Sequence, residues 1–479
     1  MELNEIIQKR IEKLNLLRQR GICPYPNKFT RSHLIKDLLK EYNEGQEVAI
    51  AGRIMAKRQH GKAAFADLRD FSGKIQLYFQ LDTVGKDSFL LFEAVDIGDF
   101  IGVKGHIFKT RTGELTVKVN EFVILSKSLR PLPEKWHGLK DIELRYRQRY
   151  LDLIVNQNIK EVFLMRTKII AAIRNFLEKK GFVEVETPML HTVAGGAAGR
   201  PFQTYHNEYN MELFLRIAPE LFLKRLLIGG FEKVFEINRS FRNEGISTRH
   251  NPEFTMLEIY SAYDDYRDMM VLVKEIINYV AQQVLGKIKF DFQGKEIDLS
   301  GEWVERSFAE AVKDKFDISA EDDTDTIIAK LNKKGKNIKE RLSRMQVVRL
   351  VEEFLQEEQE TRPIFFTDYF SILCPLAKTK PDNPLISERF ELFIAGMELA
   401  NAYSELNDPQ EQRRRFLEEI EEEQKDKKLD EDYILALEYG MPPAGGLGIG
   451  IDRLVMLFLN QPSIKDVILF PLLRPEKEE

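Results

Sequence analysis

The first twenty residues place apolar side chains at the spacing of a helix. Apolar positions recur every three or four residues, and lysines and arginines fall between them. This periodicity predicts an amphipathic helix that runs to about Arg20, before Gly21 and Pro24. The apolar positions are Leu3, Ile7, Ile11, Leu14 and Leu17.

From Glu47 to Leu125 the pattern changes to short runs that alternate apolar and polar residues, separated by Gly and Asp clusters. Such runs predict β-strands. Five strands with one helical interruption, at residues 88–94, are typical of a small Greek-key barrel of the OB type. The predicted strands are residues 48–54, 64–68, 74–79, 100–105 and 115–119.

Residues 129–149 contain two prolines and many basic side chains, and we interpret them as a linker. The remainder mixes helices and strands without regular βαβ alternation, which indicates an α+β fold. We therefore expect an N-terminal domain of residues 1–140 and a C-terminal domain of residues 141–479. Helices are expected at 158–180 and 264–284, strands within 231–243, 253–263, 389–403 and 447–450, and a solvated helical insertion without chemistry at 411–432.

Length and composition fit a globular protein of two or more domains. The chain has 479 residues, of which 43% are hydrophobic and 31% charged. Its two cysteines, Cys23 and Cys374, exclude a disulfide framework and a Cys-rich zinc site, and they fit a reducing compartment. No run of 18 apolar residues occurs, and the N-terminus has early acidic residues without an apolar core. We therefore expect no membrane span and no signal or transit peptide, and a cytoplasmic location.

The charge is unevenly distributed. Residues 1–62 carry 13 Lys and Arg against 7 Asp and Glu, so this segment is +6 and the remainder is −12 within the total of −6. Such asymmetry favours a nucleic-acid-binding end on an otherwise acidic protein. A basic, solvated helix face is the simpler alternative.

Two segments carry the densest chemistry. Residues 241–245 and 249–254 combine two arginines, a histidine, two carboxylates and two aromatic rings, and residues 446–453 add an arginine beside a run of glycines. Arginine binds phosphate oxygens through a planar, permanently charged guanidinium, and an aromatic ring with an arginine can sandwich a purine. The chain has neither a P-loop motif nor the spacing of a dinucleotide-binding G-x-G-x-x-G. These segments therefore predict a nucleotide site of another kind.

These segments resemble motifs 2 and 3 of the class II aminoacyl-tRNA synthetases, and residues 181–188 resemble motif 1. The similarity narrows to the lysine-specific family and runs from about residue 30 to Pro475. It implies an OB anticodon-binding domain, a catalytic domain built on an antiparallel sheet, and a homodimer with motif 1 in its interface. The narrowing segments are residues 195–202, 216–221 and 401–408.

Amino-acid activation joins a carboxylate to the α-phosphate of ATP. Both groups are anionic, so the enzyme must neutralise charge and hold the reactants in line. The resemblance implies that Arg242 bridges the two groups and that Phe254 and Arg453 enclose the adenine. The other implied ATP contacts are Glu244 at the adenine amino group, Arg249 and His250 at the outer phosphates, and Asn251.

Two glutamates are candidate magnesium ligands. Glu391 and Glu398 flank Ala395-Gly396, a plausible hairpin turn. A two-residue turn would place Glu398 opposite Phe393, so that both carboxylates lie on one face. Mg²⁺ takes one or two carboxylates and keeps phosphate and water ligands. The resemblance assigns these positions to Mg²⁺, and a surface hairpin with ordinary acids is the alternative.

Lysine has two ammonium groups, and each requires a carboxylate. The resemblance implies that Glu405 and Tyr260 hold the ε-ammonium, and that Glu220 and the Gly196 backbone hold the α-ammonium. Glu258 is a further candidate for an ammonium group. Asn401 and Arg242 would face the carboxylate, and Tyr403, a Phe in some members, would line the aliphatic stem.

The OB domain is expected to read uridines of the anticodon. OB barrels bind single strands by stacking bases on aromatic rings while basic residues follow the backbone. The resemblance points to Arg58, Phe65, Gln76 and Glu114. Because Phe65 belongs to an alternating strand, it could instead be a residue of the barrel core.

The implied function is the ATP-dependent ligation of L-lysine to tRNA(Lys) through a lysyl-adenylate, with release of pyrophosphate and AMP. An aspartate- or asparagine-specific enzyme is disfavoured because an acidic substrate would meet the acidic side chain of Glu405. A catalytically silent RNA-binding paralogue is disfavoured by the intact Arg242, Arg453, Glu391 and Glu398. A paralogue that lysylates proteins would be expected to lack the OB domain.

Overall fold

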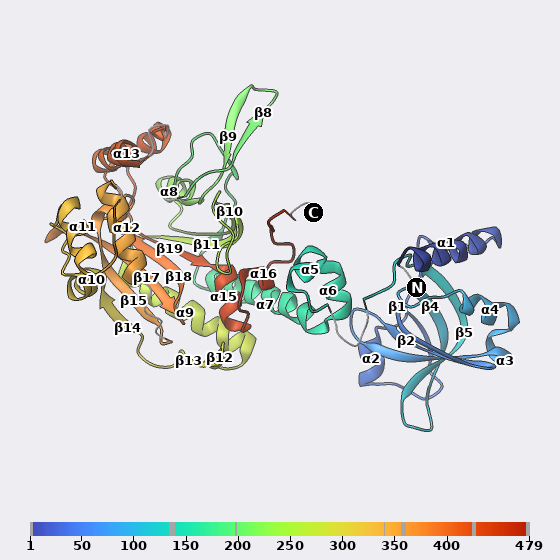
Figure 1. Cartoon of the computed structure of the whole chain (residues 1–479). Coiled ribbons are helices and arrows are strands. Elements are labelled where there is room, and N and C mark those ends of the chain that lie inside the picture. Colours follow the sequence, from blue (N-terminus) through green and yellow to red (C-terminus); the bar gives the residue numbers. More distant parts are fainter. Residues whose placement is uncertain are drawn as a thin grey trace. The chain divides into compact units, whose positions relative to one another are not determined.

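A computed structural model describes residues 3–133, 139–196, 199–339, 341–355, 361–423 and 428–475 (Figure 1). The chain divides into two compact units, residues 1–140 and 141–479, and each has its own apolar core. Residues 134–138 of the expected linker, Ala197 and Ala198 of the glycine-rich segment, and residues 424–427 of the expected insertion lie outside the described residues.

The N-terminal unit is a closed five-stranded barrel in the order β1-β2-β3-β5-β4. The five predicted strands, the helical interruption and the first helix are confirmed. The strands are β1 Glu47–His60, β2 Ala63–Arg69, β3 Lys74–Gln80, β4 Phe100–Lys109 and β5 Leu115–Ser126. The helices are α1 Leu3–Gln19, α2 Ile35–Lys40, α3 Leu81–Val84 and α4 Lys86–Glu93.

Alternation along β2 decides the position of Phe65. Ala64, Ala66 and Leu68 are at most 1% exposed and belong to the core, whereas Phe65 and Asp67 between them are half-buried. Because successive side chains of a strand point to opposite faces, Phe65 lies on the outer face of the barrel. The interpretation of Phe65 as a core residue is therefore wrong.

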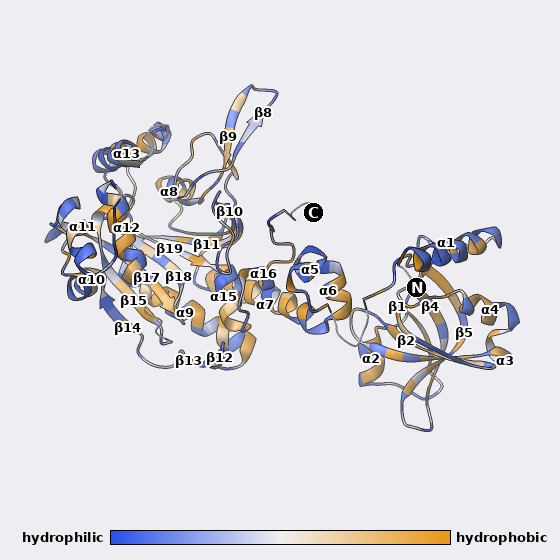
Figure 2. Ribbon diagram, in the orientation of Figure 1, coloured by the Kyte–Doolittle hydropathy of each residue, from blue (hydrophilic) through white to orange (hydrophobic). Residues whose placement is uncertain are grey.

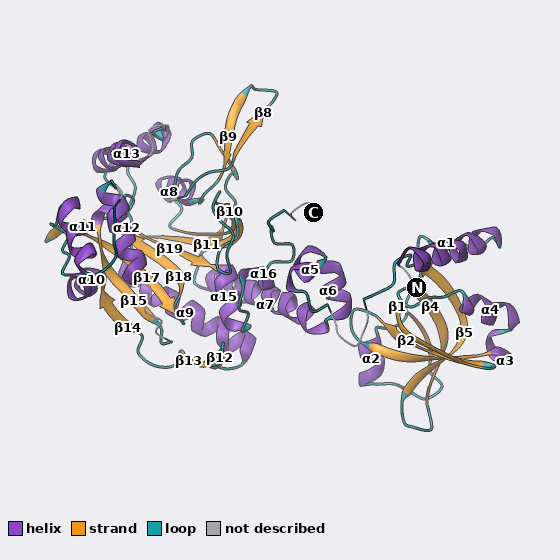
Figure 3. Cartoon of the chain, viewed as in Figure 1, coloured by secondary structure: helices purple, strands orange, loops and turns teal. Residues whose placement is uncertain are grey.

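The C-terminal unit is built on a nine-stranded sheet in the order β14-β15-β17-β18-β19-β11-β10-β6, with β16 paired to β17 (Figure 3). The sheet was expected to be antiparallel, and it is so from β15 to β10. Its two outermost pairs, β14 with β15 and β10 with β6, are parallel, so the sheet is mixed. The strands are β6 Val183–Glu184, β10 Lys233–Phe241, β11 Glu253–Ala262, β14 Val304–Ser307, β15 Ile364–Phe370, β16 Thr379–Lys380, β17 Asn383–Ile394, β18 Met397–Ser404 and β19 Ala444–Gly450.

Smaller sheets and the helices complete this unit. A three-stranded sheet has the order β7-β9-β8, and β12 pairs with β13. These strands are β7 Leu190–His191, β8 Gln203–His206, β9 Met211–Leu215, β12 Lys289–Phe292 and β13 Lys295–Asp298. The helices are α5 Ile142–Arg147, α6 Arg149–Val155, α7 Gln157–Lys179, α8 Glu220–Ile228, α9 Tyr266–Leu285, α10 Phe308–Phe316, α11 Thr324–Lys333, α12 Arg344–Leu355, α13 Pro409–Glu423, α14 Glu431–Glu438, α15 Ile451–Phe458, α16 Ile464–Val467 and the 3₁₀ turn η1 Ser371–Leu373.

The end of the expected linker is helical. Asp141 caps α5 by accepting hydrogen bonds from the backbone N–H groups of Glu143 and Leu144. Arg149 is fully buried and pairs with Asp152 at 2.7 Å. Local capping and this buried ion pair stabilise helices in a segment whose prolines and basic residues suggested none.

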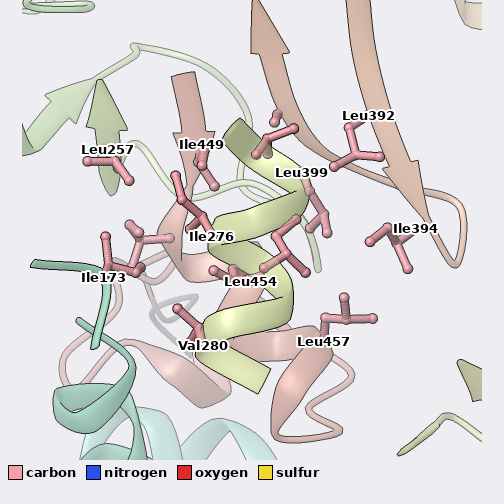
Figure 4. Packing of buried hydrophobic residues seen from close by; sticks show 14 of the residues in the cluster. Ile173, Leu257, Ile276, Val280, Leu392, Ile394, Leu399, Ile449, Leu454 and Leu457 are labelled. Atoms are coloured by element: carbon pink, nitrogen blue, oxygen red, sulfur yellow. The ribbon is translucent and has the colours of Figure 1, made fainter. Parts of the chain in front are cut away.

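One face of the large sheet carries the main core (Figure 4). Leu257 and Ile259 of β11, Leu392 of β17 and Ile449 of β19 pack there against α7, α9 and α15. The long helix α9 begins with a capping box between Asp265 and Asp268. The opposite face of the same strands carries polar side chains, and it forms the floor of the cavities described below. No helix within the described ranges is both long and apolar enough to span a membrane.

Candidate active site

A cavity of about 340 Å³ lies over the polar face of the sheet. Strand alternation explains its lining: Glu258 and Tyr260 face the cavity, whereas Leu257 and Ile259 between them enter the core. Nine predicted site residues line it, namely Gly196, Glu220, Arg242, Glu258, Tyr260, Glu391, Glu398, Asn401 and Tyr403.

Glu405 is the one predicted lysine contact that does not line this cavity. Its side chain is fully buried behind β19, against the backbone of Gly446. A Cβ at position 446 would lie 1.8 Å from Glu405 Oε1 and 2.7 Å from Tyr260 Cε1, so only glycine fits between them. Neither carboxylate oxygen of Glu405 makes a hydrogen bond of acceptable geometry with a described residue.

The ammonium of Lys224 lies between Glu405 and Glu220. Lys224 Nζ is 2.7 Å from Glu220 Oε1 and forms an ion pair with Glu405 Oε2. Lys224 was not predicted as a site residue. The sequence nevertheless indicated the contact between Lys224 and Glu220, because these residues are four positions apart on α8 and share one face of the helix.

Tyr260 contacts a different glutamate from the one expected. Its hydroxyl donates to Glu258 Oε2 at 3.2 Å. Burial, reinforced by the charge of Glu220, raises the pKa of Glu258 to about 8. Burial also raises the pKa of Glu405 to about 8, although Lys224 opposes that shift. The cavity therefore concentrates acidic groups whose negative charge is costly until cations enter.

A second cavity, of about 110 Å³, is lined by all seven predicted ATP contacts. Five residues line both cavities: Arg242, Met256, Glu398, Asn401 and Gly448. The guanidinium of Arg242 lies over the ring of Phe254, 5.2 Å from its centroid, and its buried Nε has no hydrogen-bond partner within the described chain. Arg242 is thus a cation at the junction of two cavities. The seven residues are Arg242, Glu244, Arg249, His250, Asn251, Phe254 and Arg453.

Arg453 pairs with Glu398 in this structure. It donates to the Glu398 carboxylate at 3.0 Å and to its carbonyl oxygen at 2.8 Å. Burial by itself would raise the pKa of Glu398, but the charge and hydrogen bond of Arg453 bring it below its ordinary value. Burial and the neighbouring Arg453 lower the pKa of His250, whose ring is 3.1 Å from that guanidinium.

The hairpin between β17 and β18 has the expected two-residue turn. Phe393 pairs with Glu398, and Ile394 pairs with Met397. A register shift follows Leu392, yet Glu391 and Glu398 both line the larger cavity. No cluster of three or more His, Cys, Asp or Glu side chains suited to a metal occurs among the described residues. Two carboxylates on a cavity shared with cationic groups fit a hard ion that takes its remaining ligands from phosphate and water.

Arg389, which was not predicted, connects the metal candidate to the lysine candidates. It pairs with Glu391, and its Nε donates to Asn401 Oδ1 at 3.2 Å. Tyr369 donates to the other oxygen of Glu391 at 2.9 Å. Arg389 lies two residues before Glu391 on β17, so the period of the strand was the available signal.

The expected insertion takes part in the cavity. Although α13 is largely hydrophilic (Figure 2), its residues Phe416, Glu419 and Ile420 line the larger cavity, as does Asp430. Arg415 is buried and donates to the carbonyl of Ala377 at 2.7 Å. The interpretation of this segment as merely solvated is therefore wrong. A charge-rich helix was misjudged because a few apolar positions decide its contacts.

The predicted anticodon residues gather on the outer face of the barrel. Phe65 on β2 lies opposite Tyr78 on β3, with ring centroids 4.9 Å apart, and opposite Arg58 on β1. The buried amide of Gln76 donates to Glu114 Oε2 at 2.9 Å. Tyr78 was not predicted, but it offers an aromatic face beside Phe65.

Comparison with known proteins identifies both units. A family model described as class II tRNA synthetases (D, K and N) matches residues 141–474, and one described as an OB-fold nucleic acid binding domain matches residues 48–125. The lysine–tRNA ligase of Carboxydothermus hydrogenoformans is 55% identical and is aligned over 99% of each chain. Those of Pelotomaculum thermopropionicum, at 54%, and Staphylococcus aureus, at 49%, match 99% of this chain and 96% and 99% of their own. The chain therefore belongs to the lysine–tRNA ligase family of class II tRNA synthetases.

Proposed function

We propose that the protein ligates L-lysine to tRNA(Lys) in two steps. Lysine and ATP form lysyl-adenylate and pyrophosphate, and the lysyl group then passes to the tRNA with release of AMP. The observation that carries this proposal is the pair of cavities that share Arg242, Asn401 and Glu398. An amino acid in one cavity and a nucleotide in the other would meet at these side chains.

The lysine cavity matches its substrate in charge. Glu220 and Glu258 line the cavity, and Glu405 is buried behind the lining residue Gly446, so three carboxylates lie near a substrate with two ammonium groups. Glu220 and the Gly196 backbone bind the α-ammonium, Glu405 and Tyr260 the ε-ammonium. Asn401 and Arg242 bind the carboxylate, while Tyr403 lines the stem and Glu258 supports Tyr260 through their hydrogen bond.

Arg242 holds the carboxylate and the α-phosphate together, and its fixed positive charge opposes the negative charge of both. Phe254 and Arg453 enclose the adenine, Glu244 accepts from its amino group, and Arg249, His250 and Asn251 bind on the phosphate side. Glu391 and Glu398 would hold Mg²⁺, and the bound ion would neutralise phosphate charge. Arg453 keeps Glu398 oriented through their 3.0 Å contact.

The barrel binds the anticodon, with Phe65 as the stacking ring and Arg58, Gln76 and Glu114 at the base edges and backbone. We also propose a homodimer. The motif 1 strand β6 lies at an edge of the sheet, and Val183, Met189 and Leu190 around it are 47–49% exposed. A second copy would bury these apolar side chains. A cytoplasmic location accords with the two free thiols of Cys23 and Cys374.

ATP–pyrophosphate exchange with each amino acid in turn tests the proposal. Lysine should support exchange, whereas aspartate and asparagine should not. Glu405→Gln should weaken lysine use about 30-fold or more, because removing one member of a buried charge pair costs about 2–5 kcal/mol. ATP binding should change little in that variant. Exchange that proceeds equally well with aspartate, or not at all with lysine, would overturn the proposed function.

A further inference from the structure

Lys224 is a buried cation beside the proposed lysine cavity, where it contacts the lining residue Glu220. Its side chain is 0% exposed, and its Nζ contacts Glu220 Oε1 at 2.7 Å and Glu405 Oε2. Glu220 and Lys224 come from α8, whereas Glu405 follows β18. One ammonium therefore connects the carboxylates that the proposed function assigns to the two ends of the substrate.

The charges of the site balance only when Lys224 is counted. Ionised Glu220, Glu258 and Glu405 carry three negative charges, and Lys224 leaves two of them uncompensated. The substrate lysine brings two ammonium groups, and Arg242 faces its carboxylate. Without Lys224, three carboxylates would face two ammonium groups, and one carboxylate would have to bind a proton, because an unpaired buried charge is very costly.

Among the described residues, no cation other than Lys224 lies in ion-pair contact with Glu220 or Glu405. The two ion pairs of Lys224 are with Glu220 and Glu405, and the backbone of Gly446 closes the far side of the Glu405 carboxylate. The titratable and charged groups around the pair are Glu220 on α8, Tyr433 on α14, Glu258 and Tyr260 on β11, Tyr403 on β18, Lys378 before β16, and Arg242. Tyr433 has a buried hydroxyl without a hydrogen-bond partner among the described residues.

We propose that Lys224 is a positioning residue that sets amino-acid specificity: its ammonium bridges Glu220 and Glu405, fixes the separation of the two ammonium subsites and favours the ionised form of both carboxylates. This inference rests on the proposed function, because the subsites are those of the lysine cavity. A purely structural ion pair would instead affect folding without altering how lysine binding depends on pH or on side-chain length.

The test is lysine-dependent pyrophosphate exchange by the full-length protein, with the KM for lysine followed from about pH 6 to about pH 9. Lys224→Met should raise the KM for lysine about 30-fold or more near pH 7, the scale for losing one member of a buried charge pair. The increase should shrink as pH rises, because the carboxylate that lost its cation ionises only at higher pH. The pH profile should therefore move to higher pH, with the KM for ATP unchanged.

Two further variants separate charge from shape. Lys224→Arg retains a cation, so its pH profile should return toward that of the wild type even if turnover is slower. Lys224→Met should also discriminate less between lysine and ornithine, which is shorter by one methylene, because the subsite separation is no longer fixed. If Lys224→Met does not fold, Lys224→Gln carries the same expectation, since its amide can donate to a carboxylate without supplying charge.

Lys127 provides the matched control. It is also fully buried between two carboxylates, Asp96 and Asp99, but it lies in the barrel. Lys127→Met should leave the KM for lysine and its pH profile unchanged. Wild-type protein without lysine-dependent exchange would refute the proposed function. Wild-type exchange combined with an unchanged pH profile and unchanged ornithine discrimination in the Lys224 variants would refute only the role of Lys224.

Discussion

Replacing Phe65 with alanine separates stability from tRNA binding, because Phe65 lies on the outside of the barrel. The ring is half-buried and contacts Tyr78 with centroids 4.9 Å apart, whereas the core aromatic Phe79 is 0% exposed and stacks on Phe92 at 3.9 Å. Two substitutions in the same sheet therefore remove rings of equal size from opposite faces.

The magnitudes follow from these positions. Losing the Phe65–Tyr78 pair should lower the unfolding free energy of the barrel by about 0.5–1.5 kcal/mol. Phe79→Ala, which leaves a cavity in the core, should lower it by about 3–5 kcal/mol. If Phe65 stacks on a base, Phe65→Ala should also cost about 1–3 kcal/mol of tRNA binding, or about 5-fold to 150-fold in kcat/KM for tRNA.

The assay compares two reactions of the same protein. Phe65→Ala should retain the wild-type rate of lysine-dependent pyrophosphate exchange and lose tRNA charging by the factor above. The loss should shrink on a tRNA(Lys) whose anticodon uridine has already been changed, because the missing contact is then absent in both proteins. Equal loss of exchange and charging, or destabilisation as large as that of Phe79→Ala, would refute the stacking role.

Three other perturbations probe the catalytic unit. Arg242→Ala should lower the exchange rate by about 10²–10³, the scale for losing one preorganised donor, and a loss confined to the KM for lysine in steady-state assays would contradict its bridging role. Glu391→Gln and Glu398→Gln should each raise the Mg²⁺ concentration needed for half-maximal exchange, and magnesium titrations that superimpose on the wild type for both variants would exclude the metal role. The KM for lysine should fall as pH rises toward 8 in the wild type. The pKa values of Glu258 and Glu405 are raised to about 8, and a carboxyl group that is protonated below that pH does not attract an ammonium group. A KM that stays constant between about pH 6 and about pH 8 would contradict this.

The local pattern of apolar and polar residues was enough to predict many of the secondary-structure elements. The barrel strands, the α9 helix and the two-residue turn at Ala395-Gly396 all follow from local alternation, periodicity and turn chemistry, and the structure contains them. The side of a strand on which a residue lies was harder to assign. Phe65 fits either face of an alternating strand, and only its three small or aliphatic neighbours at positions 64, 66 and 68, all in the core, decide the question.

Side-chain partners across distant elements could not be predicted. Lys224 on α8 meets Glu405, which follows β18, only because α8 packs against β11, and local patterns do not encode this packing. Arg389 likewise joins Glu391 to Asn401 across two strands. Both cations are buried, and buried cations require carboxylate partners. In both cases a basic residue lies on the same face of a helix or strand as a predicted site glutamate, and this spacing was the signal in the sequence that was missed.

Successive side chains of each strand point to opposite faces of the sheet, so one face forms the apolar core and the other lines the cavities. On β19, Leu447 and Ile449 enter the core, while Gly446, Gly448 and Gly450 face the cavities. The glycines let the backbone itself form a wall, and at Gly446 this wall lies directly against the Glu405 carboxylate. Packing of the apolar face holds the strand in place. The other face can therefore carry buried glutamates, whose charge is costly, because the position of the strand does not depend on them. The substrate can then compensate charges that destabilise the empty site. This links the selection of a substrate with two ammonium groups to the cost of burying their carboxylate partners.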